Sequence, residues 1–269
     1  IPFDPVTGVI DVARYSEVLR TQNIRLAVLN HASNVTGRVQ PVAELTRIAH
    51  GHGAHVLLDA AQTAGHWPVN MTELNVDFLA AAGHKGLLGP LGTGVLCLRP
   101  GLETHVWPLR FGGTGTSSES LVQPDEMPAR FEGGNLNLPG IASLHAASKW
   151  ILDTGVEKLC AQIHATTLRL SDQLSRIDKV RVLEPCLADD NCGIVSFNIE
   201  GMDCRDVAMI LDQSFDIQSR AGLHCAPLAH QTLQTNLHGG TIRLCPGVFT
   251  TGDNVAHVIH AVQQIAEHS

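Results

Sequence analysis

The chain is poor in lysine, in aromatic side chains and in charge. Of its 269 residues only four are lysines, while aromatic residues make up 4% and charged residues 16%. It also lacks an apolar run long enough to cross a bilayer, and a basic run that would offset its net charge of −8. These absences argue against a membrane span and against a nucleic-acid or anionic-membrane partner.

The seven cysteines are odd in number, are scattered along the chain and form no Cys-x-x-Cys pair. The start of the chain has no signal-peptide pattern. Both features favour reduced thiols over a disulfide framework and predict a cytoplasmic protein. Cys97, Cys192 and Cys245 lie in or beside apolar strands, and we expect them to be passive.

Fifteen histidines raise the question of a metal site, above all the cluster His50, His52 and His55. No His-Glu-x-x-His or comparable metal-binding spacing accompanies them, so we expect no metal site. The glycine order of a phosphate-binding P-loop is missing, and residues 113–115 lack the third glycine of the dinucleotide motif. Nucleotide binding is therefore disfavoured.

Apolar periodicity in the first half of the chain alternates between helices and short buried strands. We expect helices over residues 12–20 and 41–50, and strands over residues 26–30, 55–58, 76–81 and 94–98. This alternation predicts an α/β fold whose mostly parallel sheet is sandwiched by helices on both faces.

The second half is expected to form a smaller α+β C-terminal domain. A helix over residues 139–152 is expected to lead out of the first domain. The pattern after it predicts helices over residues 156–177, 205–214 and 253–267, strands over residues 193–199 and 241–244, and a loop over residues 220–227. We place the large domain at residues 1–150 and the small domain at residues 151–269. Residues 112–130 are predicted to form a long loop of the kind that is usually functional.

Polar residues directly follow three of the predicted strands. Asn30 and His31 follow the first, Asp59 the second, and the turn of residues 83–85 the third. Because ligands of parallel α/β sheets bind at the carboxyl ends of strands, we expect these groups to converge on one edge. This convergence is the main argument from the residues for a functional site.

Lys85 stands in an apolar and glycine-rich stretch, whereas Lys149, Lys158 and Lys179 stand in polar, helix-like sequence. We expect the Lys85 side chain to be buried. Burial would lower the pKa of its amine and leave it neutral, which is the form that Schiff-base chemistry needs. Lys85 is therefore the predicted carrier of any aldehyde cofactor.

Asp59 ends an apolar strand, where a carboxylate is costly unless a cation or hydrogen bonds satisfy it. One interpretation is a structural cap on the turn of residues 60–63. The other is a carboxylate that pairs with the protonated pyridine nitrogen of bound pyridoxal phosphate. Gln62 is expected to face the same side as Asp59. The residues alone leave both interpretations open.

Cys225 lies in a loop shaped by Gly222 and Pro227, with His224 and Arg220 close in sequence. Such neighbours favour a thiolate and make the sulfur a candidate nucleophile. A passive, half-buried cysteine is the alternative.

Arg243 is a cation between apolar neighbours in the predicted strand of residues 241–244. It either grips a carboxylate through two hydrogen bonds or is an ordinary edge-strand arginine. Sequence alone does not decide between these two roles.

Six segments occur in the order in which one protein family carries them. They are residues 31–37 (His-Ala-Ser-Asn-Val-Thr-Gly), 58–63 (Leu-Asp-Ala-Ala-Gln-Thr), 82–86 (Ala-Gly-His-Lys-Gly), 130–137 (Arg-Phe-Glu-Gly-Gly-Asn-Leu-Asn), 220–225 (Arg-Ala-Gly-Leu-His-Cys) and 241–244 (Thr-Ile-Arg-Leu). Together they resemble the class V aminotransferases, which are fold-type I pyridoxal-phosphate enzymes, and within them the cysteine desulfurase and selenocysteine lyase branch.

The resemblance implies a cofactor site for pyridoxal 5'-phosphate. Lys85 matches the Schiff-base lysine, and Asp59 matches the partner of the pyridine nitrogen. Gln62 matches the residue that hydrogen-bonds the phenolic oxygen, Asn34 the asparagine beside cofactor and substrate, and His84 a phosphate contact.

The resemblance also implies a substrate site and a sulfur acceptor. Arg243 resembles the arginine that binds the substrate carboxylate, and Arg220 lies at the start of the catalytic-cysteine loop. Cys225 matches the cysteine that takes sulfur from the substrate as a persulfide.

Three features depart from the family pattern. Ala82 stands where Ser or Thr usually binds phosphate. Asn135 replaces a threonine that reaches the partner subunit's phosphate, although its amide can still donate a hydrogen bond. Family members begin with a further N-terminal portion, which carries a phosphate loop at a helix N-terminus and an aromatic residue that stacks on the cofactor. We expect its absence from this sequence to weaken cofactor binding.

The activity implied by the resemblance is cysteine desulfuration by a homodimer with a shared active site, in which L-cysteine yields L-alanine and a persulfide on Cys225. A sulfur-acceptor protein is a further implied partner. Two alternatives stay open. One is a selenocysteine or cystine lyase, or another class V enzyme that keeps the cofactor. The other is a non-catalytic fragment or binding protein whose site has decayed.

Overall fold

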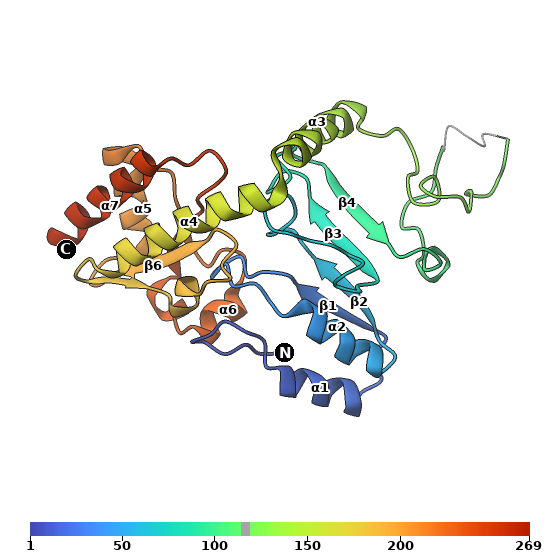
Figure 1. Ribbon diagram of the computed structural model, residues 1–269, viewed down its shortest axis with the longest axis horizontal. Coiled ribbons are helices and arrows are strands. Elements are labelled where there is room, and N and C mark those ends of the chain that lie inside the picture. The colour runs from blue at the N-terminus through green and yellow to red at the C-terminus, as the bar shows by residue number, and fades with distance from the viewer. Residues whose placement is uncertain (114–118) are drawn as a thin grey trace.

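The computed structural model describes residues 1–113 and 119–269, and within them the strands form two separate four-stranded sheets (Figure 1). The first sheet contains β1 (Leu26–Asn30), β2 (His55–Asp59), β3 (Phe78–Ala82) and β4 (Gly94–Leu98), in that order. The first three strands are parallel, and β4 pairs antiparallel to β3. This confirms the predicted mostly parallel sheet.

Helices α1 (Val12–Thr21) and α2 (Val42–Gly51) cover one face of the first sheet. Asp11 begins α1 by accepting a hydrogen bond from the Arg14 N–H, as an N-cap residue does. The apolar side chains of both helices and of the strands between them share one core, which includes Tyr15, Leu19, Leu29, Leu45, Val56 and Leu58.

The opposite face of the first sheet is open. Val28 is 62% exposed, Leu96 51% and Leu26 45%. Helix α2 and the turns of residues 60–77 connect parallel strands that are added in one direction. Right-handed connections of this kind all lie on the same face of a sheet. The expectation that helices cover both faces is therefore wrong for the described residues.

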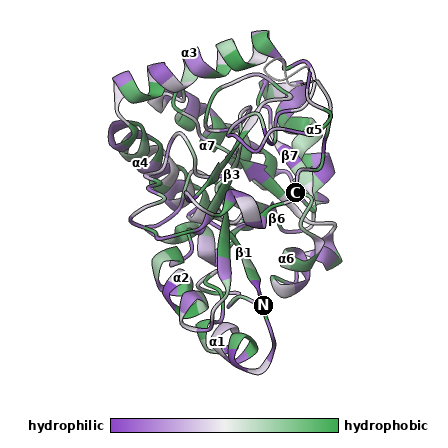
Figure 2. Cartoon of the chain, turned by 90° about the vertical axis from the view of Figure 1, so that its right-hand side faces the viewer, coloured by the Kyte–Doolittle hydropathy of each residue, from purple (hydrophilic) through white to green (hydrophobic). Residues whose placement is uncertain are grey.

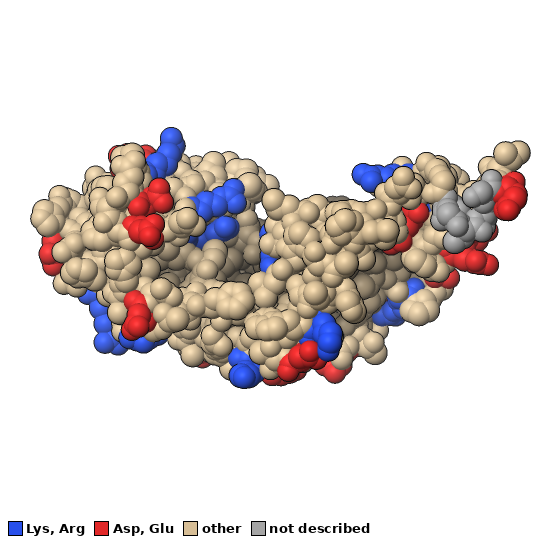
Figure 3. All heavy atoms as spheres, turned by 90° about the horizontal axis from the view of Figure 1, so that it is seen from above, with Lys and Arg blue, Asp and Glu red and all other residues tan. Residues whose placement is uncertain are grey.

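The two sheets lie in separate halves of the molecule, which the long helix α4 (Val156–Ser175) connects (Figure 1). The strands are largely hydrophobic, while the outer helices alternate between polar and apolar residues (Figure 2). Seen from above, the surface is hollowed between the halves (Figure 3). None of the helices within the described ranges is both long enough and apolar enough to cross a bilayer.

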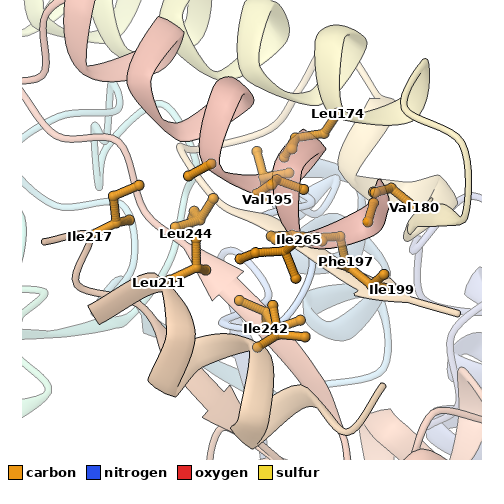
Figure 4. Close-up of a cluster of buried hydrophobic side chains, with 14 of the residues drawn as sticks. Leu174, Val180, Val195, Phe197, Ile199, Leu211, Ile217, Ile242, Leu244 and Ile265 are labelled. Carbon is orange, nitrogen blue, oxygen red and sulfur yellow. The ribbon is translucent and has the colours of Figure 1, made fainter. Parts of the chain in front are cut away.

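The second sheet is antiparallel throughout and has the order β5 (Val180–Val182), β6 (Val195–Ile199), β8 (Thr241–Leu244) and β7 (Arg220–Gly222). Helix α4 packs against it together with α5 (Cys204–Phe215) and α7 (Gly252–Glu267). Their shared core is drawn in Figure 4 and includes Leu174, Val195, Phe197, Leu211, Ile242 and Ile265.

The remaining elements are short or differ from the expectation. Helix α3 (Leu138–Thr154) confirms a predicted helix, whereas β5, β7, the short helix α6 (Pro227–Thr232) and the 3-10 turns Glu103–His105, Glu184–Leu187 and Asn236–His238 were not predicted. The predicted loop of residues 112–130 has no helix or strand where it is described, and residues 114–118 of it lie outside the described residues. The domain boundary after residue 150 stays a prediction.

The loop after β1, which we call the docking loop (residues 31–40), joins the first sheet to the second. Val35 is fully buried, and its carbonyl accepts a hydrogen bond from Ser196 Oγ at 2.5 Å. The neighbouring Thr36 carbonyl accepts one from Asn191 Nδ2 at 3.1 Å. The two halves are therefore held by buried hydrogen bonds to main-chain atoms, which do not depend on loop side chains.

Asp77 organises the end of the first sheet that lies away from the polar strand ends. Its Oδ2 accepts hydrogen bonds from the Val56 N–H at 2.8 Å and from His50 Nε2 at 2.7 Å, and Arg99 lies 3.5 Å from Oδ1. Burial raises the pKa of Asp77, but the His50 and Val56 hydrogen bonds and the charges of His50 and Arg99 outweigh it. The pKa of this carboxyl is therefore lowered.

We predict that Asp77→Asn lowers the free energy of unfolding by about 2 kcal/mol at pH 7, because hydrogen bonds to a buried charge are lost. The folded pKa is lowered, so the carboxylate stabilises the protein above its unfolded pKa of about 4 and stops doing so as the pH falls through the folded value. The difference between variant and parent should shrink on acidification. Urea unfolding at several pH values measures it.

Asp153→Asn is the matched control, because Asp153 pairs with Lys149 at the surface and is 63% exposed. We expect it to change stability by less than about 0.5 kcal/mol. Equal unfolding midpoints for the two variants at pH 7 would contradict the role given to Asp77.

Candidate active site

Asp59 lies at the carboxyl end of β2 and is half-buried. Its Oδ1 accepts a hydrogen bond from the Ala61 N–H at 2.9 Å, so it caps the turn that follows, although no helix begins there. Its other carboxylate oxygen makes no hydrogen bond to the described residues. Asp59 also lines a groove of about 430 Å³ on the open face of the sheet, together with Leu57 and Leu96. The structural cap therefore leaves one oxygen for a ligand.

Lys85 lies in a tight turn after β3. The Gly83 N–H donates to the Thr93 carbonyl at 2.9 Å, and the Gly89 N–H donates to the Gly83 carbonyl at 2.7 Å. The Lys85 side chain is exposed, so its predicted burial is wrong. The glycines and alanines around it are apolar, but they have too few side-chain atoms to cover a long side chain that projects from a turn.

Glycines place the Lys85 turn directly on the turn that follows Asp59. A Cβ on Gly86 would lie 2.1 Å from His66 Nδ1 and 2.5 Å from the Ala64 carbonyl oxygen. A Cβ on Gly65 would lie 2.2 Å from the Gly86 carbonyl oxygen. No larger residue fits this approach of two backbones without movement.

Gln62 and Lys85 line the same pocket, which has a volume of about 220 Å³. The facing wall comes from the second half of the chain and includes Cys192 and Cys245. His66 joins the two walls, because its Nε2 donates to the Cys192 carbonyl at 3.0 Å. Burial lowers the pKa of His66, and the hydrogen bond to the Cys192 carbonyl opposes this effect without cancelling it. The pocket thus lies between the two halves.

Cys225 lies in the loop between β7 and α6 and is exposed. The Arg220 Nη2 donates a hydrogen bond to its Sγ at 3.0 Å. The sulfur and the guanidinium of the predicted site therefore lie in direct contact.

Arg220 and Arg243 stand directly opposite each other on β7 and β8. Like charges in such positions repel. Arg243 Nη1 donates to the Asn34 carbonyl at 2.7 Å, while its Nε is buried without a hydrogen-bond partner among the described residues. Two guanidinium groups with an unused donor suit an anion such as a carboxylate. Basic side chains are also visible in the hollow of Figure 3.

Asn34 connects the arginine pair to the Cys225 loop. Its Nδ2 donates to the His224 carbonyl at 2.6 Å, and its own carbonyl receives the Arg243 hydrogen bond. Asn34 and Cys225 both line a larger pocket of about 670 Å³, which also borders α1 and the N-terminal segment. The structure thus brings Asn34, Arg220, Arg243 and Cys225 into one cluster.

Strand β8 links this cluster to the Lys85 pocket, since Arg243 belongs to the cluster and Cys245, two residues on, lines the pocket. His84 and Asn135 are exposed and line neither pocket. Their phosphate contacts stay predictions.

Two residues at the site, Cys245 and His224, were not assigned a role from the sequence. Cys245 lines the Lys85 pocket, and the expectation that it is passive stays a prediction. His224 was noted only as a neighbour of Cys225, but it is buried and bonded through Nε2 to Thr241 Oγ1 at 2.9 Å. The adjacency of His224 and Cys225 was the one available signal, because the Thr241 contact joins residues far apart in the chain.

Comparison with known proteins identifies the family. The family model described as aminotransferase class-V matches residues 2–258. This chain belongs to the class V aminotransferase family. It is 37% identical to a probable cysteine desulfurase from Methanothermobacter thermautotrophicus, and 32% identical to another from Pyrococcus abyssi. These matches cover 96% and 97% of the chain but 64% of each relative, so the chain spans about two thirds of their length.

Solved structures agree with this placement. The apo structure of a cysteine desulfurase from Thermococcus onnurineus superposes with a TM-score of 0.89 at 32% identity, over 100% of this chain and 66% of that one. The cysteine desulfurase CsdA (S-sulfonic acid) from Escherichia coli gives 0.81 at 27% identity, over 94% and 62%. The expected pyridoxal-phosphate transferase fold, as well as the predicted resemblance to class V aminotransferases, is thereby confirmed.

We predict that Gly86→Ala lowers the free energy of unfolding by about 2 kcal/mol, because the added methyl group forces the Lys85 turn away from His66. Gly51→Ala is the control, since a Cβ on Gly51 meets nothing within 4 Å. Urea unfolding of both variants measures the difference. If Gly86→Ala is as stable as Gly51→Ala, the turn is not held by this close contact.

Proposed function

We propose that the protein is a pyridoxal-phosphate-dependent cysteine desulfurase that moves the sulfur of L-cysteine to Cys225 and releases L-alanine. The observation that carries the proposal is the cluster of Asn34, Arg220, Arg243 and Cys225, linked through β8 to the pocket that Lys85 lines. The similarity to proteins named cysteine desulfurases supports it.

Two neighbouring pockets, which share Ala61 in their walls, offer groups that fit pyridoxal phosphate. Lys85 offers an exposed primary amine to its aldehyde, and Gln62 offers an amide in the same pocket for its phenolic oxygen. Asp59 offers a carboxylate with one free oxygen for its protonated ring nitrogen. When bound, the cofactor supplies an electron sink for the negative charge that develops at the substrate α-carbon. We propose that His84 and Asn135, which are exposed at the surface, contact its phosphate.

The arginine pair would bind the substrate carboxylate. Arg243 has an unused Nε donor, and Arg220 lies opposite it with its Nη2 on the Cys225 sulfur. A carboxylate between two guanidinium groups relieves their repulsion and accepts charge-assisted hydrogen bonds. Asn34, which already binds Arg243, would hold the substrate end of this arrangement in place.

The sulfur transfer needs two groups of this chain. The Lys85 amine would take the proton from the substrate α-carbon as a general base. Cys225 Sγ would attack the substrate sulfur, so that the carbon–sulfur bond of the substrate breaks and a sulfur–sulfur bond forms on Cys225. The hydrogen of the thiol ends on L-alanine, so the step balances without an outside oxidant.

We also propose a homodimer with a shared site, a sulfur-acceptor protein that docks at Cys225, and a cytoplasmic location. The exposure of Cys225 supports access by an acceptor. Large apolar side chains exposed on one segment support contact with a second subunit. They are Trp107, Leu109, Phe111, Leu121 and Val122.

The first test is an absorbance spectrum of the purified chain with added pyridoxal phosphate, followed by borohydride reduction and peptide mapping. We expect an imine absorbance band and a label on Lys85, because only this lysine lines the pocket among the described residues. Lys85→Ala should remove the band, whereas the control Lys149→Ala should keep it. A label spread over Lys149, Lys158 and Lys179, or no band, would overturn the cofactor proposal.

Substrate assays on the unreduced chain loaded with pyridoxal phosphate separate the enzymatic alternatives. Release of L-alanine from L-cysteine supports desulfuration. Turnover of selenocysteine or cystine without turnover of L-cysteine would instead assign the cofactor site to a lyase.

A further inference from the structure

The turn that carries Cys225 has an unusual backbone. His224 has a φ of 50° and Cys225 a φ of 61°, so two successive residues with side chains are left-handed. This region is unfavourable for residues other than glycine, and surrounding contacts must hold it. The position of the Cys225 sulfur therefore depends on what holds His224.

Two hydrogen bonds clamp His224. His224 is 2% exposed, and its Nε2 lies 2.9 Å from the hydroxyl of Thr241, which is fully buried at the start of β8. Its carbonyl accepts a hydrogen bond from Asn34 Nδ2 at 2.6 Å. One clamp ties the ring to the second sheet, and the other ties the main chain to the docking loop. Both act on the residue directly before Cys225.

The ring acts as a neutral group. Burial, followed by the charges of Arg243, His230 and Arg220, lowers the pKa of His224 to about 4. At pH 7 the clamp on Thr241 is therefore a hydrogen bond between uncharged groups, which avoids the cost of a buried charge. It also leaves Arg220 as the cation in contact with the sulfur.

We propose that His224 is a positioning residue that sets the Cys225 sulfur beside Arg220 through its clamps on Thr241 and Asn34. The proposal deepens the proposed function and rests on it for its catalytic meaning, since a sulfur acceptor must stand at a fixed place to meet its substrate. The contact that the clamps maintain is the hydrogen bond of 3.0 Å from Arg220 Nη2 to Cys225 Sγ.

The test compares how fast anionic iodoacetate and neutral iodoacetamide alkylate Cys225 in the full chain, with peptide mapping by mass spectrometry. A guanidinium beside the sulfur attracts the anionic reagent. The ratio of the iodoacetate rate to the iodoacetamide rate therefore reports on the Arg220 contact. Cys97, which is also exposed, serves as an internal reference. A change that only makes Cys225 more accessible, while the Arg220 contact is kept, raises both rates together and leaves this ratio unchanged.

Thr241→Val removes the hydroxyl at nearly constant volume, and Thr241→Ser keeps it. We expect Thr241→Val and His224→Leu to lower the ratio at Cys225 about fivefold, as for a unit charge lost from contact distance in water. Thr241→Ser should keep the parent ratio. Arg220→Gln defines the value at which the contact is fully lost. Thermal unfolding checks that each variant is folded. If His224→Leu is not folded, the comparison of Thr241→Val with Thr241→Ser decides the proposal.

Thr235→Val is the matched control, because Thr235 Oγ1 lies 2.7 Å from His230 Nδ1 in a second buried His–Thr pair outside the Cys225 turn. We expect it to keep the parent ratio. An unchanged ratio in Thr241→Val, or an equal fall in Thr235→Val, would overturn the proposal. Alkylation needs neither cofactor nor turnover. If the ratios are as expected but the chain has no desulfurase activity, the proposed function fails while the positioning role of His224 stands.

Discussion

The docking loop is the contact on which the candidate site depends. Three successive carbonyl groups of this loop, in residues 34–36, accept hydrogen bonds from Arg243, Ser196 and Asn191 of the second half. Gly37 follows with a φ of 74°, and a Cβ there would lie 2.2 Å from the Asn191 side-chain oxygen. The loop begins at the polar end of β1, so the bonds that join the halves also place the arginine pair beside the strand ends of the first sheet.

The topology of the first sheet explains both where the site lies and why it is open. Parallel strands bring their carboxyl ends to one edge, which is where Asp59 and the Lys85 turn are found. Connections added in one direction leave the other face of the sheet uncovered, and Val28 and Leu96 are exposed there. An open apolar face of this extent marks a surface for further contacts. The groove at Asp59 lies on this same face.

Much of the fold follows from local sequence patterns, and the errors have identifiable physical causes. The strands Leu26–Asn30, Gly94–Leu98 and Thr241–Leu244 were predicted at their observed limits because short apolar runs between turn residues define them. Strand β7 was missed because Arg-Ala-Gly has no alternating pattern, and its strand character comes only from pairing with β8. The covering of both sheet faces was wrong because strand order, which decides it, is not a local property.

Some features of the candidate site could likewise be predicted from local sequence, whereas others could not. Proximity of Arg220 to Cys225 could be anticipated, since both lie in one short segment. The burial expected for Lys85 was wrong, because apolar neighbours in the sequence do not cover a side chain that leaves a tight turn. The hydrogen bonds that connect Asn34 with His224 and Arg243 join segments about two hundred residues apart, and no local sequence pattern predicts them.

The most direct test of the account follows the sulfur atom. The cofactor-loaded chain is given one equivalent of L-cysteine labelled with heavy sulfur, and its cysteine peptides are mapped by mass spectrometry. The account predicts one heavy sulfur atom on Cys225 for each L-alanine formed. L-alanine without heavy sulfur on Cys225, or with the label on Cys97 or Cys245, would contradict it.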